Sequence, residues 1–420
     1  MNFLVIAHAH PDFSVGGAEI AAYNLYTSLR GGSGQTATLL ARTNSPHTSV
    51  GVISRWREGE YLWRQDMGDW FRLATASPQS VVRGFREFLL KIKPDAVYVH
   101  HYAHIGLEIL REIRHTLPEC RLFLTLHEYM AICHHQGQMV KTDSSRRLCN
   151  RSSPEECSGC YPQLTPESFW LRRQYIEKHF NAVDHFVSPS HFLRDRYIAW
   201  GIAPDRISVI ENGQPTPLQQ VPNGPSHSDV IKFGYFGQIT AYKGVDVLLQ
   251  AITLLTPEQR RGLQLEMHGA NLDQQTESFQ ARIKELAEPL IREGSVRWIG
   301  AYKREDLLRR MSAVDWLIVP SIWWENSPMV IQEAFVCGKP VICSDIGGMA
   351  EKVQHGQTGL HFEARNPYAL SQAVLTACTD YGMSIRNRGG TFRSVGYEES
   401  AAQYISLLDQ GVPSGKRFGA

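Results

Sequence analysis

Short apolar runs alternate with stretches of helical periodicity along most of this 420-residue chain. Such alternation is typical of parallel sheets covered by helices, because a crossover between parallel strands normally contains a helix. The runs that we expect to be strands are Phe3–Ala7, Thr36–Ala41, Ala96–His100, Arg121–Leu126, His185–Ser188, Ser208–Ile210, Ile231–Phe236, Leu263–His268, Val296–Ile299, Trp316–Val319, Val341–Cys343 and Gly359–Phe362. The stretches that we expect to be helices are Glu19–Arg30, Val81–Lys91, Leu107–Thr116, Glu167–Phe180, Phe192–Trp200, Val245–Leu255, Gln274–Ile291, Glu305–Met311, Pro328–Cys337, Ala369–Thr379 and Glu398–Leu408.

A stretch rich in proline and glycine, at 213–229, divides these elements into two series. No apolar period survives there, and its breakers are Gly213, Pro215, Pro217, Pro222, Gly224 and Pro225. The chain is also longer than one hydrophobic core usually serves. We therefore predict a first domain at 1–212, a linker at 213–229 and a second domain at 230–396. A helix at 397–410 could cross back onto the first domain, and the tail at 411–420 is expected to be disordered.

Composition and charge narrow the class of protein. The 43 basic and 42 acidic residues nearly cancel, so no overall field attracts nucleic acid and no nucleic-acid partner is expected. The apolar run Met1–Ala7 ends at His8, before it reaches the length of a signal peptide, and no later run approaches the ~18 residues of a membrane span. A cytoplasmic protein is expected, in which cysteines stay mostly reduced.

The most informative segment holds two glutamates eight residues apart, Glu325 and Glu333. Ser327 is a favourable N-cap and Pro328 suits the first helical turn, so a helix should begin there and end at Gly338. Glu325 then lies just before the helix, while Glu333 lies about five residues inside it, roughly 7–8 Å along the axis.

The helix start between these carboxylates would be an anion site. The backbone N–H groups of Met329, Val330 and Ile331 have no partner within a helix that begins at this point. A phosphate bound there would have carboxylates on both sides to accept hydrogen bonds from hydroxyl groups, which suits a nucleotide sugar. The alternative is an amphipathic helix that packs on a sheet, with Glu333 solvated on its outer face.

This segment also resembles a family signature. The run from Trp324 to Phe335, followed by Gly338-Lys339-Pro340-Val341-Ile342 and Asp345-Ile346-Gly347-Gly348, resembles the Glu-x7-Glu motif of retaining glycosyltransferases of the family 4 type. The resemblance implies an α/β GT-B architecture, with two Rossmann-like domains facing each other across a cleft. It implies acceptor binding by the first domain and nucleotide-sugar binding by the second. Glu325 would bind hydroxyls of the donor sugar, with Asn326 beside it, and Glu333 would bind the ribose diol.

Two glycine-rich segments of the first domain have different explanations. Gly16-Gly17-Ala18-Glu19 follows the first strand and opens the first helix, where glycine lets an anion approach the backbone N–H groups. It is either a plain turn or, as the resemblance implies, the loop that faces the donor diphosphate. Gly32-Ser33-Gly34-Gln35-Thr36-Ala37 fits the dinucleotide fingerprint, but it follows a helix and opens a strand, so an NAD site is not expected.

The second domain has its own loop for phosphate at Phe236–Gly244. Lys243 can place a point charge on a phosphate at the following helix start. The family usually has an arginine at the position of Gln238, and this arginine and the lysine both contact the donor diphosphate. A neutral amide gives up the charge-assisted part of that bond, so Lys243 would carry more of the charge. Gly269 and Tyr302 are expected near the sugar and base of the donor.

His127 ends a strand at the carboxyl edge, where open α/β sheets place ligand groups. A lone histidine there is more often structural. The resemblance instead implies that it faces the donor sugar near the anomeric carbon, where it would hydrogen-bond a hydroxyl and polarise the reacting centre.

The loop at 129–165 is rich in cysteine. Cys133, Cys149, Cys157 and Cys160 have spacings that suit a tetrahedral zinc site, with His134 and His135 as substitute ligands. Disulfides and uncoordinated thiols are the alternatives. Such a metal would be structural, since it would brace the edge of the active site without catalysing.

Aromatic residues recur in the region 53–72. Trp56, Trp63, Met67 and Trp70 fall on one face if the region is helical. That face either packs on the first domain or, beside Arg57 and other basic residues, makes peripheral contact with a membrane or an acceptor.

Together these features predict a retaining glycosyltransferase that moves a sugar from a nucleotide diphosphate donor to a hydroxyl of a saccharide or lipid-linked saccharide acceptor. A role in assembling bacterial surface polysaccharide, at the inner face of the cell membrane, is expected. The sequence contains no Asp-x-Asp motif, so catalysis without a metal is expected. The alternatives are a nucleotide-sugar epimerase, a glycosidase and a non-catalytic nucleotide-sugar binder.

Overall fold

The computed structural model describes residues 1–14, 16–45, 48–215, 230–409 and 418. The chain forms two compact units, Met1–Gly213 with Val395–Ala420, and Gln214–Ser394. The predicted linker therefore lies almost entirely outside the described residues, as does the predicted tail apart from Phe418.

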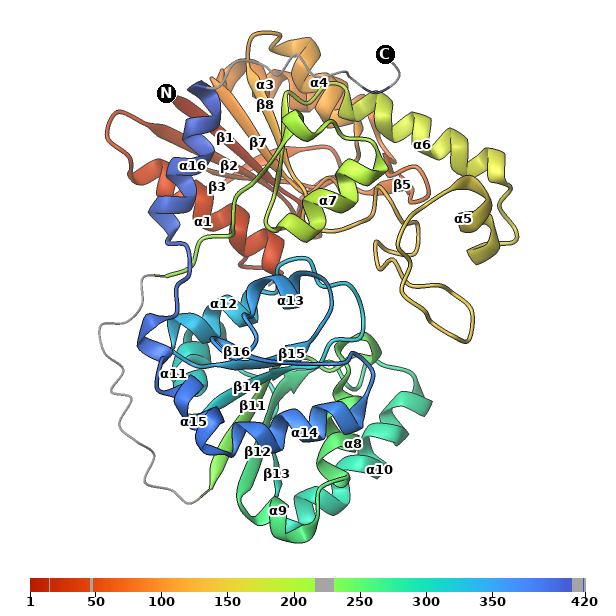
Figure 1. Ribbon diagram of the computed structural model, residues 1–420. Helices are drawn as coiled ribbons and strands as arrows, with labels where there is room; N and C mark the ends of the chain where they lie inside the picture. Colours follow the sequence, from red (N-terminus) through yellow and green to blue (C-terminus); the bar gives the residue numbers. More distant parts are fainter. Residues whose placement is uncertain (15, 46–47, 216–229, 410–417, 419–420) are drawn as a thin grey trace. The chain divides into compact units, whose positions relative to one another are not determined.

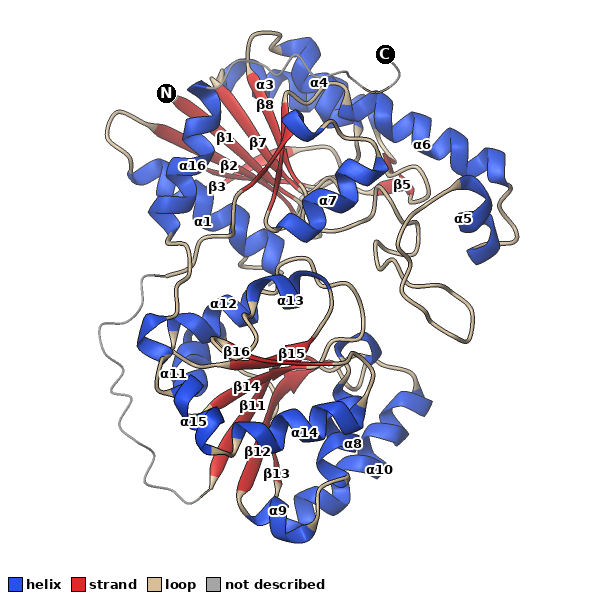
Figure 2. Cartoon of the chain, in the orientation of Figure 1, coloured by secondary structure: helices blue, strands red, loops and turns tan. Residues whose placement is uncertain are grey.

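The first unit is built on an eight-stranded sheet with the order β10-β9-β8-β7-β1-β2-β4-β3 (Figures 1 and 2). Neighbouring strands of this sheet pair in parallel, except that β3 and β4 are antiparallel. The strands of this unit are β1 Asn2–Ala7, β2 Thr36–Arg42, β3 Ile53–Arg57, β4 Glu60–Trp63, β7 Ala96–His100, β8 Arg121–Thr125, β9 His185–Ser188 and β10 Ile207–Val209, with a separate hairpin of β5 Met67–Asp69 and β6 Ala74–Thr75. The helices are α1 Gly17–Gly31, α2 Pro78–Ser80, the π-helix η1 Val81–Phe85, α3 Arg86–Ile92, α4 Glu108–Thr116, α5 Pro154–Cys160, α6 Pro166–Phe180, α7 His191–Trp200, the 3₁₀ turn η2 Pro204–Arg206 and α16 Tyr397–Asp409.

The helix α16, from the far end of the chain, belongs to the first unit and lies beside α1 (Figure 1). Its Tyr404 is buried against the sheet. The hydroxyl of Tyr98 in β7 donates to the Tyr404 carbonyl at 3.1 Å, and the Tyr404 hydroxyl lies 3.0 Å from Thr125 Oγ1 at the end of β8. These bonds hold the helix against two neighbouring strands inside the sheet, β7 and β8.

The second unit is built on a six-stranded parallel sheet with the order β13-β12-β11-β14-β15-β16. Its strands are β11 Ile231–Gln238, β12 Leu263–Ala270, β13 Val296–Trp298, β14 Trp316–Val319, β15 Val341–Ser344 and β16 Gly359–Phe362. Its helices are η3 Ala241–Lys243, α8 Val245–Thr253, α9 Pro257–Arg261, α10 Glu277–Glu293, η4 Arg304–Asp306, α11 Leu307–Ser312, α12 Met329–Val336, α13 Gly347–Lys352, α14 Pro367–Ala377, α15 Asp380–Arg386 and η5 Gly389–Thr391.

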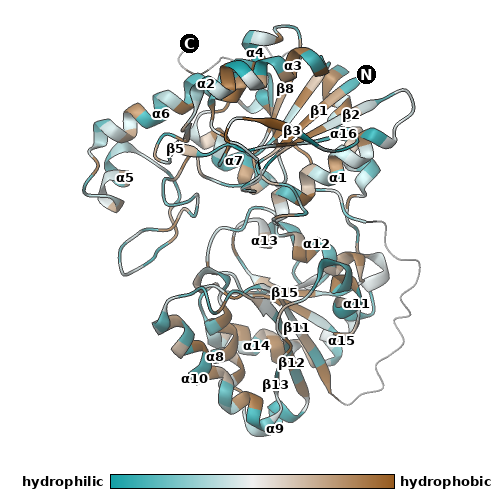
Figure 3. Ribbon diagram, turned by 180° about the vertical axis from the view of Figure 1, so that it is seen from behind, coloured by the Kyte–Doolittle hydropathy of each residue, from teal (hydrophilic) through white to brown (hydrophobic). Residues whose placement is uncertain are grey.

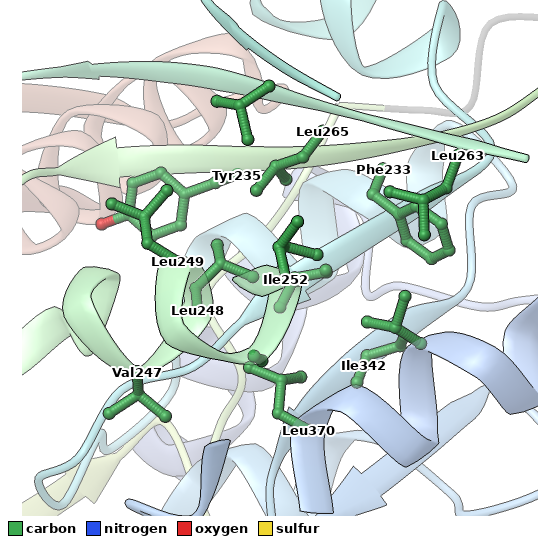
Figure 4. Packing of buried hydrophobic residues seen from close by; sticks show 14 of the residues in the cluster. Phe233, Tyr235, Val247, Leu248, Leu249, Ile252, Leu263, Leu265, Ile342 and Leu370 are labelled. Atoms are coloured by element: carbon green, nitrogen blue, oxygen red, sulfur yellow. The ribbon is translucent and has the colours of Figure 1, made fainter. Parts of the chain in front are cut away.

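The core of the second unit fills the space between this sheet and its helices. Phe233, Leu248, Ile252, Leu265 and Ile342 are fully buried, and their side chains converge between the strands and α8 (Figure 4). In Figure 3 the strands of this sheet are coloured mostly as hydrophobic, as expected for strands covered by helices. Each such side chain stabilises the fold by about 1.5–3 kcal/mol. This packing fixes the carboxyl ends of the strands, from which the loops of the site project.

The prediction that residues 53–72 form a helix with an aromatic face is wrong. Trp56 and Trp63 lie in β3 and β4, two antiparallel strands joined by a turn at Gly59, which has φ +76°. That left-handed turn interrupts any helix, because glycine adopts it without the steric cost that other residues incur. Trp63 is buried, whereas Trp56 and Trp70 are 45% and 43% exposed.

Candidate functional site

The helix α12 begins one residue later than predicted. Its first residue is Met329 and its N-cap position is Pro328, so Ser327 does not cap it. A residue before proline is pushed towards extended backbone, which moves the start of the helix along the chain. Gly338 follows the last turn with φ +65°, as expected for a glycine after a helix end.

The start of α12 keeps unpaired donors. The Ile331 N–H donates to the Pro328 carbonyl at 3.1 Å, so Ile331 is not one of the free donors that the sequence predicted. The first N–H groups, of Met329 and Val330, have no partner inside the helix. The Ser327 hydroxyl is buried, and no other described residue makes a hydrogen bond with it. A buried hydroxyl at a helix start with free N–H groups is suited to an anionic ligand.

Glu325 is held in place just before this helix. Its Oε1 accepts hydrogen bonds from Lys243 Nζ at 2.6 Å, Ser321 Oγ at 2.8 Å and Trp323 Nε1 at 2.9 Å. Burial alone would raise the pKa of Glu325, but the charge and hydrogen bond of Lys243 and the bonds from Ser321 and Trp323 lower it below its usual value. The carboxylate is therefore ionised and fixed. Asn326 follows it, and its Oδ1 accepts a hydrogen bond from the Ser327 N–H.

Glycines on two other segments make this arrangement possible. Gly244, directly after Lys243, has φ +66°, and a Cβ there would lie 2.0 Å from the Pro320 carbonyl oxygen. The Gly348 N–H donates to the Glu325 carbonyl at 2.7 Å, and a Cβ on Gly348 would lie 1.7 Å from the carbonyl oxygen of Asn326. The glycine pair of α13 thus supports the carboxylate loop through close backbone contact, which spacing along the chain could not reveal.

Glu333 lies inside the unit and not on a solvated face, so the alternative of an outward-facing helix side is wrong. It is only 7% exposed, and burial raises its pKa while the Arg304 guanidinium, 3.7 Å away, opposes the rise. Burial, and then the nearby Glu333 carboxylate, raises the pKa of Tyr302 to about 12. The Gly269 N–H donates to the Gly300 carbonyl at 3.0 Å, which joins β12 to the segment that carries Tyr302.

Gln238 is exposed at the carboxyl end of β11. Its backbone carbonyl accepts a hydrogen bond from the Tyr235 hydroxyl at 2.5 Å. The loop after it leads through η3 to Lys243, so both residues project from the same strand end.

The first unit gathers histidines at the carboxyl edge of its sheet. His127, after β8, has its Nε2 3.1 Å from Nδ1 of His100, the last residue of β7. Next to them, the His8 ring centroid lies 4.5 Å from that of His101 and 6.0 Å from that of His104. Burial lowers the pKa of His127 and His101 well below the usual value. These imidazoles are therefore neutral near pH 7, where they can donate or accept hydrogen bonds.

Only His127 of this cluster was predicted. His8 follows β1, and His101 and His104 follow β7, which are neighbouring parallel strands. A signal did exist, because a histidine follows each of three predicted strands. The strand order that brings those ends together is not visible in the sequence.

The Gly16-Gly17 loop opens α1, with Gly16 at the N-cap position. However, the Glu19 carboxylate lies against it: its Oε1 accepts from Ser14 Oγ at 3.0 Å and lies 3.4 Å from His8 Nε2. Burial raises the pKa of Glu19, but the hydrogen bond and charge of His8, with help from Ser14, bring it below its usual value. An ionised carboxylate at this loop weakens its attraction for a diphosphate, and the sequence alone does not predict this contact.

The cysteine-rich loop does not support the predicted zinc site. Cys133, Cys149, Cys157 and Cys160 line one pocket, together with His134 and His135. Yet in the part of the chain that the structure describes, no three His, Cys, Asp or Glu side chains are arranged to hold a metal ion. All eight cysteines are free thiols. Burial raises the pKa of Cys157 to about 11 and that of Cys133 above its usual value.

None of the helices formed by the described residues is long and apolar enough to span a membrane.

Two family models match the chain. The model described as Glycosyltransferase Family 4 matches residues 15–216, and the model described as Glycosyl transferases group 1 matches residues 220–389. D-inositol 3-phosphate glycosyltransferase of Corynebacterium glutamicum (strain R) is 28% identical over 59% of this chain and 62% of its own length. Glycogen synthase of Mycobacterium tuberculosis (strain H37Rv) is 24% identical over 90% of this chain and 86% of its own length. The chain covers 61 to 62% of the length of the first three curated relatives.

Solved structures share the fold. Sucrose-phosphate synthase from Thermosynechococcus elongatus aligns with a TM-score of 0.70 at 18% identity, covering 98% of this chain and 99% of its own. The Anabaena protein HepE, in complex with UDP, aligns with a TM-score of 0.65 at 18% identity, covering 97% of this chain and 100% of its own. These likenesses show the α/β GT-B fold. Since the two family models between them match most of both units, the chain belongs to the glycosyltransferases of the family 4 type.

Proposed function

We propose that this protein transfers a sugar from a nucleotide diphosphate sugar to an acceptor hydroxyl, with retention of anomeric configuration. The observation that carries the proposal is the start of α12. There a fixed carboxylate, Glu325, and a buried carboxylate, Glu333, flank a buried hydroxyl, Ser327, that no other described residue hydrogen-bonds.

The donor would be bound along this segment. Its diphosphate would accept hydrogen bonds from the N–H groups of Met329 and Val330 and from the Ser327 hydroxyl, with the Pro328 ring fixing the entry of the chain. Glu333 would accept hydrogen bonds from the ribose diol, and Asn326 would contact the sugar together with Glu325. Gly269 and Tyr302 would line the region of the base. Because HepE was solved with UDP, UDP is the first nucleotide to test.

Three side chains would act on the reacting centre. Lys243 would stabilise the negative charge that develops on the leaving diphosphate, assisted by Gln238 and the helix start, so the proposed reaction needs no metal ion. Lys243 is paired with Glu325, and the diphosphate would share this cation. Glu325 would orient the donor sugar. The neutral His127 would hydrogen-bond a sugar hydroxyl near the anomeric carbon. The loop at Gly16 and Gly17 would approach the diphosphate through its backbone N–H groups, against the repulsion of the ionised Glu19 carboxylate.

For the acceptor we infer a saccharide or lipid-linked saccharide used in bacterial surface polysaccharide. O-antigen chain mannosyltransferase B of Escherichia coli is 32% identical over 35% of this chain and 36% of its own length, which supports this class. The exposed Trp56 and Trp70 of the region 53–72 support contact with a saccharide or with the inner face of the membrane.

The test is release of nucleotide diphosphate from a panel of nucleotide sugars, measured with and without acceptor extracts. The proposal predicts release that depends on acceptor, together with a glycosylated product. A change of the donor sugar without acceptor would instead indicate an epimerase. Donor binding without turnover, in every donor and acceptor combination, would indicate a binder and contradict the proposal.

A further inference from the structure

His100 occupies an unusual place beside the proposed site. It is the last residue of β7, and it is 1% exposed. Its Nδ1 lies 3.1 Å from Nε2 of His127. Burial, and then the proximity of His8, lowers the pKa of His100 to about 3. Both rings are therefore neutral near pH 7, and a hydrogen bond between them requires that one of the facing nitrogens carries the proton while the other accepts it.

The other nitrogen of His100 faces a polar cavity. No described residue makes a hydrogen bond with His100 Nε2 or with Asn24 Nδ2, and both atoms are buried. Both residues line the same small pocket, beneath α16, together with Ser400 and Tyr404. Leaving a buried polar atom unpaired is unfavourable. A water molecule that bridges such atoms in a polar cavity removes that cost.

The surroundings of His100 hold the ring in one place. β7 lies between β1 and β8 in the sheet, and the His100 ring packs against the rings of His127 and Tyr404, with centroids 5.2 and 5.8 Å away. Tyr404 is itself tied to β7 and β8 by hydrogen bonds. A rigid ring whose Nδ1 faces His127 couples the two tautomers, because Nε2 of His127 must accept if Nδ1 of His100 donates, and must donate if Nδ1 accepts.

We propose that His100 is a positioning residue, which holds the His127 imidazole in one orientation and one tautomer while its own Nε2 binds water in the cavity beneath α16. The catalytic consequence rests on the proposed function, because it assumes that His127 contacts the donor sugar. The predicted effect of His100 on the tautomer of His127 does not depend on the proposed function. The simpler alternative is that His100 is only a core residue that fills space.

Substitutions at His100 separate these alternatives. Asparagine can place an amide near the position of Nδ1, and glutamine can place one near the position of Nε2, whereas phenylalanine keeps the ring and removes both nitrogens. The positioning role therefore predicts that His100→Asn is tolerated and that His100→Gln and His100→Phe are not. A space-filling role predicts the least damage from His100→Phe. His185→Gln is the matched control. His185 is also buried in this sheet, but it lies at the amino end of β9, away from the histidine cluster, where it pairs with Ser208.

The experiment uses the full chain and three readouts. They are kcat and donor KM from nucleotide release, the thermal midpoint, and the imidazole ¹⁵N signals of His127 by NMR. We expect kcat to fall about tenfold in His100→Gln and His100→Phe, with donor KM unchanged, and by less than about threefold in His100→Asn. We expect His127 to give one tautomer in the wild type, in His100→Asn and in His185→Gln, and a mixture in the other two variants.

The NMR signals distinguish the two proposals. If the wild type shows no sugar transfer but His127 still loses its single tautomer in His100→Gln, the proposed function fails and the positioning role stands. If asparagine and glutamine give the same kcat and the same His127 signals, the positioning role is wrong. This comparison stays valid if His100→Phe does not fold, because it uses the two amide variants alone.

Discussion

The loops at the carboxyl ends of the two sheets carry different chemistry. In the second unit the loops are charged, since Lys243 pairs with Glu325 at 2.6 Å and Arg304 lies 3.7 Å from Glu333. In the first unit they carry buried histidines such as His100 and His127, whose pKa values are lowered by burial. Fixed charges suit a charged nucleotide, whereas neutral imidazoles suit sugar hydroxyls. Under the proposed function, the charged side chains of the second unit would hold the nucleotide sugar, and the neutral imidazoles of the first unit would add hydrogen bonds to sugar hydroxyls.

The largest expected effect comes from breaking the ion pair of the second unit. Lys243→Met removes the cation that we assign to the leaving diphosphate, and it leaves Glu325 buried without its strongest partner. We expect kcat/KM for the donor to fall by about 10²–10³-fold. Lys284→Met is the matched control, because Lys284 is exposed on α10. A Lys243→Met enzyme with more than a third of wild-type activity would refute this role.

A smaller effect is expected from the second carboxylate. Glu333→Gln keeps the size of the side chain but removes charged hydrogen bonds to the ribose, so nucleotide affinity should weaken by about 10- to 100-fold, or roughly 1.5–3 kcal/mol. Titration calorimetry with UDP measures this directly. Glu288→Gln, at an exposed position of α10, should bind like the wild type. Equal affinities in the wild type and Glu333→Gln would remove the ribose assignment.

The two units should also respond differently to acid. The pKa of His100 in the folded chain, about 3, lies below its usual value of 6.5. Between these two pH values the imidazole is protonated in the unfolded chain but stays neutral in the folded chain. The stability from this group is present above pH 6.5 and is lost as pH falls from there towards 3. As the pH falls from 7 to 5.5, each buried neutral histidine should lower the free energy of unfolding by about 1 kcal/mol.

Hydrogen exchange, corrected for intrinsic rates, checks this prediction. The opening free energy of β7 and β8 should drop more than that of β11 and β14 over this pH range. His100→Asn should reduce the drop, because asparagine does not titrate. Equal losses in the two sheets would contradict the contrast between neutral and charged loops.

The smallest expected effect concerns the acceptor. Trp70 is exposed, and its ring centroid lies 4.8 Å from that of His104 in the histidine cluster, which makes it a stacking surface for a sugar. Trp70→Ala should raise the acceptor KM by about threefold, and UDP affinity should stay unchanged. Trp170→Ala is the control, because Trp170 is also exposed, on α6. An effect of Trp70→Ala on UDP binding alone would place this face on the donor side.

Local features of the sequence predicted much of this structure. The strands and helices of both series are confirmed to within a few residues, because each depends on apolar periodicity within one short segment. The segment from Glu325 to Glu333 could be located for the same reason. The predicted N-cap residue, Ser327, was wrong. It precedes a proline, and the steric effect of that proline outweighs the usual preference for serine at an N-cap.

Features that depend on distant segments could not be predicted. The ion pair of Lys243 with Glu325 and the contact of Gly348 with Asn326 join different loops of one sheet edge. The carboxylate of Glu19 meets His8 only because α1 folds back on β1. In the region 53–72, tryptophan spacing suited both a helix and a pair of strands, and the turn at Gly59 decided between them.

The proposed function requires that a nucleotide binds at the start of α12. Hydrogen exchange of the full chain with and without saturating UDP measures whether it does. We predict slower exchange in peptides that cover 323–336 and 238–247, and unchanged exchange in α10 at Glu277–Glu293. If saturating UDP protects other peptides and leaves exchange in 323–336 unchanged, the nucleotide does not bind at the start of α12.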